Sequence, residues 1–136
     1  MVSQYEIILS PYKRGFHLIT SKVLEKLKEL PQSGICNVFI HHTSAALTIN
    51  ENADASVRAD FETFFNAIVP DAFKGFTHIL EGSDDMSAHI KASILGYSVT
   101  IPIENSKLKL GTWQGIYLCE FRNDASSRKI TVTIIS

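Results

Sequence analysis

Four of the five histidines lie beside hydroxyl or acidic residues, so they are the first candidates for chemistry in this sequence. Residues 41–44 read HHTS, while His78 and His89 flank the acidic segment 81–85. Imidazole binds divalent metals and also titrates near neutral pH, so such a set can hold a cation or transfer protons. The spacing alone does not specify a metal, because it matches neither an HExxH helix nor a pair of CxxC motifs.

Two local arguments narrow this set. Successive strand residues point to opposite faces, so only one of His41 and His42 can face a given pocket, and we select His42 because it adjoins the Thr43-Ser44 turn. Asp85 and His89 are one turn apart on a predicted helix, so the carboxylate can orient the ring or join it in a metal shell. The alternative is an Asp85 that caps the helix and a solvated His89.

Several other side chains could bind an anionic or polar ligand. Asn50, Glu51 and Asn52 fall where a predicted strand gives way to a helix N-terminus, which can receive a phosphate, although ordinary capping and turn chemistry also explains them. Lys91 and Arg122 can neutralise phosphate charge, or equally form surface ion pairs. The hydroxyls of Thr43 and Ser44 complete this set of candidate substrate-binding groups.

The segment 110–115 (LGTWQG) contains the only tryptophan, Trp113. Small residues on either side let the chain turn tightly and bring its backbone close to a ligand, which makes Trp113 a candidate pocket wall. Alternatively, its ring fills the core between strands, because aromatic burial is stabilising by itself.

Hydrophobic periodicity predicts the elements that must position these residues, and together they indicate an α+β domain. Strand composition occurs in eight segments: 3–9, 14–19, 35–40, 45–49, 98–103, 107–110, 115–122 and 129–135. The first two are expected to be a first pair of strands. Alternation in 115–122 is imperfect, so we expect helices or another subunit to cover both faces there.

Helical spacing predicts three helices. The first is capped by Thr20 and stopped by Pro31, and the second is capped by Asp54, stopped by Pro70 and expected to pack its aromatic stripe inward. The third covers 86–95, with Asp84 or Asp85 as cap and Gly96 as terminator. Residues 71–82 lack periodicity and are expected to form a long surface loop, where binding residues often gather.

Composition sets the class of protein. A chain of 136 residues with 45% hydrophobic content fits one domain, residues 1–136. The net charge is −1, so the chain lacks the excess of basic residues that binding to a nucleic-acid backbone requires. No apolar run reaches the roughly 18 residues of a membrane span, and the first ten residues do not resemble a signal peptide, so we expect a cytoplasmic protein. Cys36 and Cys119 lie in apolar runs and are expected in the core.

Four segments together resemble the YjbQ family of small bacterial and archaeal proteins, also described as secondary thiamine-phosphate synthases. The resemblance spans nearly the whole chain. It is carried by GFHLIT (15–20), HTSAALTINEN (42–52), EGSDDMSAHIKAS (81–93) and LGTWQGIY (110–117). Ser87 stands where proline is common in the family, and Asn105-Ser106 replaces a usual glycine turn; neither departure touches the proposed ligands.

The resemblance implies an α+β fold in which a mixed or antiparallel sheet curls towards a barrel with helices packed on it. It also implies a homotrimer with pockets near the subunit boundaries. A divalent metal, zinc or magnesium, is expected on histidines matching His42, His78 and His89, and the activity implied is a weak thiamine-phosphate synthase.

Our leading hypothesis is a metal-assisted transferase that joins a pyrimidine pyrophosphate to a thiazole phosphate. Asp85, His89 and Glu51 would be its catalytic residues. Substrate would be bound by the hydroxyl, amide, cationic and aromatic candidates Thr43, Ser44, Asn50, Lys91, Trp113 and Arg122. The alternatives are a metal-dependent hydrolase of a phosphorylated or ester small molecule and a non-catalytic metabolite-binding protein.

Overall fold

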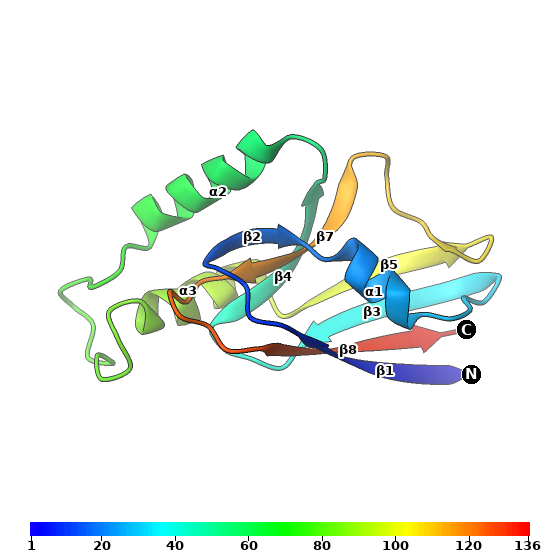
Figure 1. Ribbon diagram of the computed structural model, residues 1–136, viewed down its shortest axis with the longest axis horizontal. Coiled ribbons are helices and arrows are strands. Elements are labelled where there is room, and N and C mark those ends of the chain that lie inside the picture. Colours follow the sequence, from blue (N-terminus) through cyan, green and yellow to red (C-terminus); the bar gives the residue numbers. More distant parts are fainter.

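The computed structural model describes residues 1–136 and contains eight strands and three helices (Figure 1). The strands are β1 (Val2–Leu9), β2 (Gly15–Leu18), β3 (Ser33–Ile40), β4 (Ala45–Glu51), β5 (Ser98–Glu104), β6 (Lys107–Leu108), β7 (Gln114–Glu120) and β8 (Arg128–Ile135). The helices are α1 (Thr20–Lys26), α2 (Ala55–Ile68) and α3 (Asp85–Leu95). The α+β prediction is confirmed.

All strand pairs are antiparallel, and the strands form two sheets, β1-β8-β3-β5-β6 and β2-β7-β4, which curl around a shared core as a half-barrel (Figure 1). The first two strands do not pair with each other, because β1 pairs with β8 and β2 pairs with β7. The chain termini lie together at one end of the molecule, and α3 lies at the other (Figure 1).

The central strand β7 is buried on both faces. Ile116 and Leu118 face the main core, which lies between the two sheets and is formed by aliphatic side chains of both. Tyr117 and Cys119 face a second core on the opposite side, to which α3 contributes small side chains. Helices therefore cover the second face of β7, which explains the imperfect alternation along 115–122 and confirms the expectation of cover on both faces.

Helix α1 differs from its prediction at both ends. It ends at Lys26, well before Pro31, because Leu27 already has an extended backbone. Thr20 is the first helical residue rather than the cap, and its Oγ1 accepts a hydrogen bond of 2.9 Å from the Ile116 N–H. The hydroxyl therefore attaches α1 to β7 instead of satisfying the helix terminus.

Helix α2 begins as predicted, because the Asp54 side chain caps it by accepting from the Ser56 N–H at 2.9 Å. Its aromatic stripe turns inward only in part. The rings of Phe61 and Phe65 are partly buried against β2, whereas Phe64 is 59% exposed and the helix has no fully buried residue. The prediction that the aromatic stripe packs inward is therefore confirmed for Phe61 and Phe65 and wrong for Phe64.

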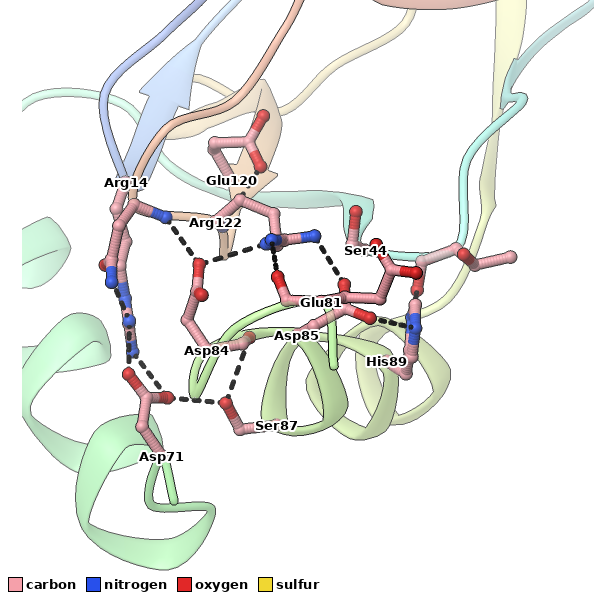
Figure 2. Close-up of polar contacts among 12 residues, drawn as sticks. Arg14, Ser44, Asp71, Glu81, Asp84, Asp85, Ser87, His89, Glu120 and Arg122 are labelled. Carbon is pink, nitrogen blue, oxygen red and sulfur yellow. Dashed lines mark hydrogen bonds and ion pairs between the residues drawn. The ribbon is translucent and has the colours of Figure 1, made fainter. Parts of the chain in front are cut away.

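The connection between α2 and α3 lacks regular structure, as predicted, but it is anchored at its base. The Ala72 N–H donates to the Ser83 carbonyl at 3.1 Å. Asp71 accepts from Arg14 at 2.6 Å and from the Ser87 hydroxyl at 2.5 Å (Figure 2). Burial disfavours the charged form of Asp71, but these hydrogen bonds and the nearby cationic charges outweigh it, so the pKa of Asp71 lies below its ordinary value.

Both cysteines are free and fully buried, which confirms their assignment to the core. Burial raises the pKa of the Cys36 thiol to about 11, so this thiol remains protonated and inert near neutral pH. None of the three helices has the length and apolar character that crossing a membrane requires.

Candidate metal centre

His78, Asp85 and His89 bring three potential metal-ligand atoms within 4.8 Å of one another. Asp85 and His89 lie one turn apart on α3, as predicted, with His89 Nε2 at 3.0 Å from Asp85 Oδ2. His78 comes from the connection between α2 and α3, and its Nε2 lies 2.7 Å from the same oxygen. The Asp85 side chain is only 5% exposed, against 29% for His89 and 48% for His78, so a buried carboxylate supports two accessible imidazoles.

The backbone orients the His89 ring. Its Nδ1 lies 3.0 Å from the Thr43 carbonyl oxygen, which can only accept, so Nδ1 carries the proton of that hydrogen bond. Nε2 is then the nitrogen available to a cation. A ligating histidine commonly donates its other N–H to a carbonyl or carboxylate in this way. Thr43 therefore contacts the candidate centre through its main-chain carbonyl, and the residue is exposed.

Arg122 holds Asp85 from the other side (Figure 2). Its Nη1 donates to Asp85 Oδ1 at 2.5 Å, while Nε donates to Asp84 Oδ2 and Nη2 to the Glu81 carbonyl. These bonds leave Asp85 Oδ2 directed at the two imidazoles. Arg122 therefore has a positioning role, because each of its three nitrogens donates a hydrogen bond to the protein, and its predicted role in binding phosphate stays a prediction.

Asp84 in turn holds Arg122, by accepting a hydrogen bond from its Nε. Burial disfavours its charged form, but hydrogen bonds from the Asn123 N–H and Arg122 outweigh burial and lower the pKa of the Asp84 carboxyl. Asp84 precedes α3 without capping it through its side chain, so its carboxylate serves Arg122 instead. The prediction that Asp84 or Asp85 is the cap residue of α3 is therefore confirmed for the position of Asp84, although the Asp84 side chain makes no capping hydrogen bond.

His42 does not belong to the group of three. Its Nε2 accepts a hydrogen bond of 2.8 Å from the Lys129 N–H, so the ring is neutral and carries its proton on Nδ1. Burial lowers the pKa of His42, and the charge of Arg128 lowers it further. The prediction that His42 is a metal ligand is corrected, because its Nε2 lone pair already links the turn after β3 to β8.

Asn50 and Glu51 lie at the opposite end of β4 from Thr43, a strand length of roughly 20 Å. Glu51 Oε2 accepts from the N–H groups of Ala53 and Asp54 at 2.9 and 2.8 Å, and Asn50 Oδ1 accepts from the Glu51 N–H. The ordinary turn-chemistry interpretation fits both side chains, since α2 itself is capped by Asp54. Within one chain, Glu51 is not a catalytic neighbour of His89, and Asn50 is not a substrate contact at this centre.

Trp113 also lies at that far end, where the Asn52 N–H donates to its carbonyl oxygen. Its side chain is 63% exposed. The interpretation that its ring fills the core is therefore wrong. Trp113 does not lie near His89 of its own chain, and its role as a pocket wall stays a prediction.

Lys91 and Ser44 are buried, so neither can reach a ligand in solution. Lys91 Nζ donates to Asn66 Oδ1 at 2.6 Å and lies 5.6 Å from the centroid of the Phe121 ring. Burial, and then the charge of Arg14, lower the pKa of Lys91 against the opposing effect of nearby carboxylates. Both predicted substrate contacts are replaced by structural roles.

Sequence reasoning missed a buried ion pair close to the 41–44 turn. Arg128 donates through Nε and Nη2 to the two Glu120 oxygens at 2.7 and 2.5 Å, and Nη2 also donates to Ser44 Oγ at 3.0 Å. Glu120 is fully buried. The only signal for it in the sequence was the charged Glu120 inside an apolar strand, which did not indicate Arg128 as its partner.

The fold defines the class of this protein: a small α+β protein with curled antiparallel sheets and three helices. The sequence model described as "UPF0047 protein YjbQ-like" matches residues 5–136. The chain belongs to this family.

Individual relatives agree with this assignment. The UPF0047 protein YjbQ of Salmonella typhimurium is 48% identical over 133 residues, which cover 96% of each chain. A solved YjbQ/UPF0047-family structure from Clostridium acetobutylicum has a TM-score of 0.83 at 41% identity and covers 96% of this chain and 99% of its own. A YbjQ-like protein from Sulfolobus solfataricus has a TM-score of 0.85 at 30% identity, covering 98% and 96%.

Proposed function

We propose that this protein binds a divalent cation through His78, Asp85 and His89 and acts on a small phosphorylated metabolite. The observation that carries the proposal is the convergence of two imidazoles and one carboxylate, all within 4.8 Å. Such a donor set favours zinc over magnesium, because magnesium prefers oxygen ligands. Three ligands also leave a coordination position open, which is typical of catalytic zinc rather than structural zinc.

The reaction we propose is the transfer suggested by the family resemblance. The bond between the pyrimidine methylene carbon and the pyrophosphate oxygen breaks, the thiazole nitrogen forms a bond to that carbon, and pyrophosphate leaves. A bound cation would supply charge neutralisation to the leaving group. The chain's own contribution is orientation, since Thr43 fixes the His89 ring and Arg122 fixes the Asp85 carboxylate.

The test is a paired assay on protein freed of metal by a chelator and then reloaded with zinc. We expect the zinc form to yield thiamine phosphate and pyrophosphate from the two substrates, and the metal-free form to yield neither, as followed by liquid chromatography and mass spectrometry. Absence of thiamine phosphate from the zinc form contradicts the transferase proposal.

The open coordination position also suits hydrolysis, which is the second candidate function. A reaction mixture without the thiazole substrate separates the two, because only a hydrolase consumes the pyrimidine pyrophosphate in water alone. A protein that only binds the metabolite would raise its melting temperature with added ligand and form no product.

We also propose that the chain assembles as a homotrimer. The resemblance supports this, and so do exposed apolar side chains on the two long helices: Phe64, Ile68 and Ile94 are 59%, 52% and 56% exposed. Exposed apolar surface of this kind often marks an interface between proteins.

Light scattering coupled to gel filtration is expected to give about three times the 15.1 kDa mass of one chain. The double variant Phe64→Glu/Ile68→Glu should elute at the mass of one chain. Ile8→Glu is the matched control, since Ile8 is equally exposed, at 59%, but lies on β1. A wild-type protein that elutes as a single chain contradicts the assembly.

A further inference from the structure

The largest hollow of the molecule, about 360 Å³, adjoins the metal centre through a shared wall, His78. It is formed almost entirely by the connection between α2 and α3, including Phe73, Lys74, Phe76, Ile79 and Ser83. Its volume falls in the range of sites for small metabolites. None of these five residues was singled out in the sequence as a candidate for function.

The hollow has a fixed frame despite lying in a loop. The hydrogen bond from the Ala72 N–H to the Ser83 carbonyl closes residues 72–83 into a compact loop whose ends meet. Asp71, next to this closure, is held by Arg14, which directly precedes β2, and by Ser87 from α3. The cavity is therefore largely formed before a ligand binds, which reduces the entropy lost on binding.

The polar groups of the hollow are free to receive an anion. Lys74 Nζ forms no ion pair or hydrogen bond within the chain, and the Ser83 hydroxyl also has no partner. By contrast, Arg122, Arg128 and Lys91 all have protein partners. An unpaired ammonium and a free hydroxyl from two residues that line one hollow are donors suited to a phosphate or carboxylate.

The apolar walls indicate the rest of the ligand. The Phe73 and Phe76 rings lie 5.2 Å apart, tilted by 57°, and Ile79 adds an aliphatic side chain. Phe73 is 56% exposed, so its ring is available for stacking on a flat partner. A ligand with only charged groups would leave these side chains in contact with water.

We infer that this hollow is the substrate pocket of the proposed metal centre, and that it takes a small aromatic molecule carrying a phosphate. The phosphate pairs with Lys74 and Ser83, and the aromatic ring packs on Phe73 and Phe76. His78 then faces both the ligand and the cation. The inference rests on the proposed function for the cation, but the pocket itself consists of residues that do not ligate metal, apart from His78.

The experiment uses phenyl phosphate as the probe and isothermal titration calorimetry as the measurement, on the full chain with zinc and after treatment with chelator. We expect phenyl phosphate to bind at least about tenfold more tightly than inorganic phosphate, because only the former uses the aromatic walls. Lys74→Glu should weaken phenyl phosphate binding by at least about tenfold, because it reverses the charge facing the phosphate. Lys107→Glu, at an exposed lysine on β6, is the control and should bind as the wild type does.

The chelator arm separates this inference from the proposed function. If the protein binds no zinc but phenyl phosphate still binds in a Lys74-dependent way, the metal proposal fails and the pocket stands. Equal affinity of wild type and Lys74→Glu overturns the pocket, as does a wild type that does not bind phenyl phosphate. Equal affinity for phenyl phosphate and inorganic phosphate also overturns it, because the ring is then not recognised.

Discussion

Replacing Arg128 by Met is expected to lower the free energy of unfolding by about 3–5 kcal/mol, the largest stability effect among the changes considered for this chain. The substitution leaves the fully buried Glu120 carboxylate without its bidentate partner and removes the donor to Ser44. An uncompensated buried charge is more destabilising than the loss of an exposed ion pair, which contributes about 0–1 kcal/mol. Urea unfolding followed by circular dichroism measures the difference.

The double variant Glu120→Gln/Arg128→Met is the matched control. It removes both charges, and the amide introduced at position 120 still offers an oxygen to the Arg122 N–H, which now donates to the Glu120 carboxylate. We expect it to recover more than half of the loss, because replacing both members of a buried pair removes the stranded charge. If the double variant is as unstable as Arg128→Met, packing or the Ser44 contact accounts for the loss, rather than the buried charge.

The second large effect concerns the cation. His89→Ala should weaken zinc binding by more than about a hundredfold, because it removes one of the three proposed ligands, whereas removing outer partners of a ligand typically weakens binding by about 10–100-fold. Competition with a chromophoric chelator measures the affinity without any assay of activity. Asp85→Asn should have an effect of the same kind, since the carboxylate oxygen lies within 3.0 Å of both imidazoles.

His42→Ala provides the discriminating control for the cation. The family resemblance implies that His42 is a ligand, whereas its Nε2 accepts from the Lys129 N–H and lies outside the cluster. We therefore expect zinc affinity to remain within about twofold of the wild type, a free-energy change of about 0.4 kcal/mol. A loss comparable to that of His89→Ala would show that His42 reorients to bind the cation.

Local rules predicted most secondary structure because the signals lie within a few residues of one another. The Asp54 cap, the Gly96 terminator and the strand runs at 35–40 and 129–135 were all read correctly from neighbouring residues. The errors arose where a distant strand intervened. Thr20 reads as a helix cap locally, but its hydroxyl binds β7, almost a hundred residues further along the chain.

For the candidate centre, spacing predicted one pair and nothing more. Asp85 and His89 share a face because residues four apart on a helix are neighbours, which is a property of the helix alone. Composition made His78 a candidate because it flanks the acidic segment 81–85, but a loop without periodicity gives no direction for its side chain. The free Lys74 ammonium and the buried Lys91 look alike in the sequence, and their different environments arise from the packing of other elements.

Periodicity and short-range hydrogen bonds are enough to predict the α+β class, the boundaries of most elements and the side chains that share one face of α3. Tertiary structure alone decided that Asn50, Glu51 and Trp113 lie a strand length away from His89, that His42 is held by β8, and that Glu120 meets Arg128. The physical reason is that burial and pairing depend on which strands are adjacent in the sheets, and strand adjacency is set by cooperative packing of the whole core.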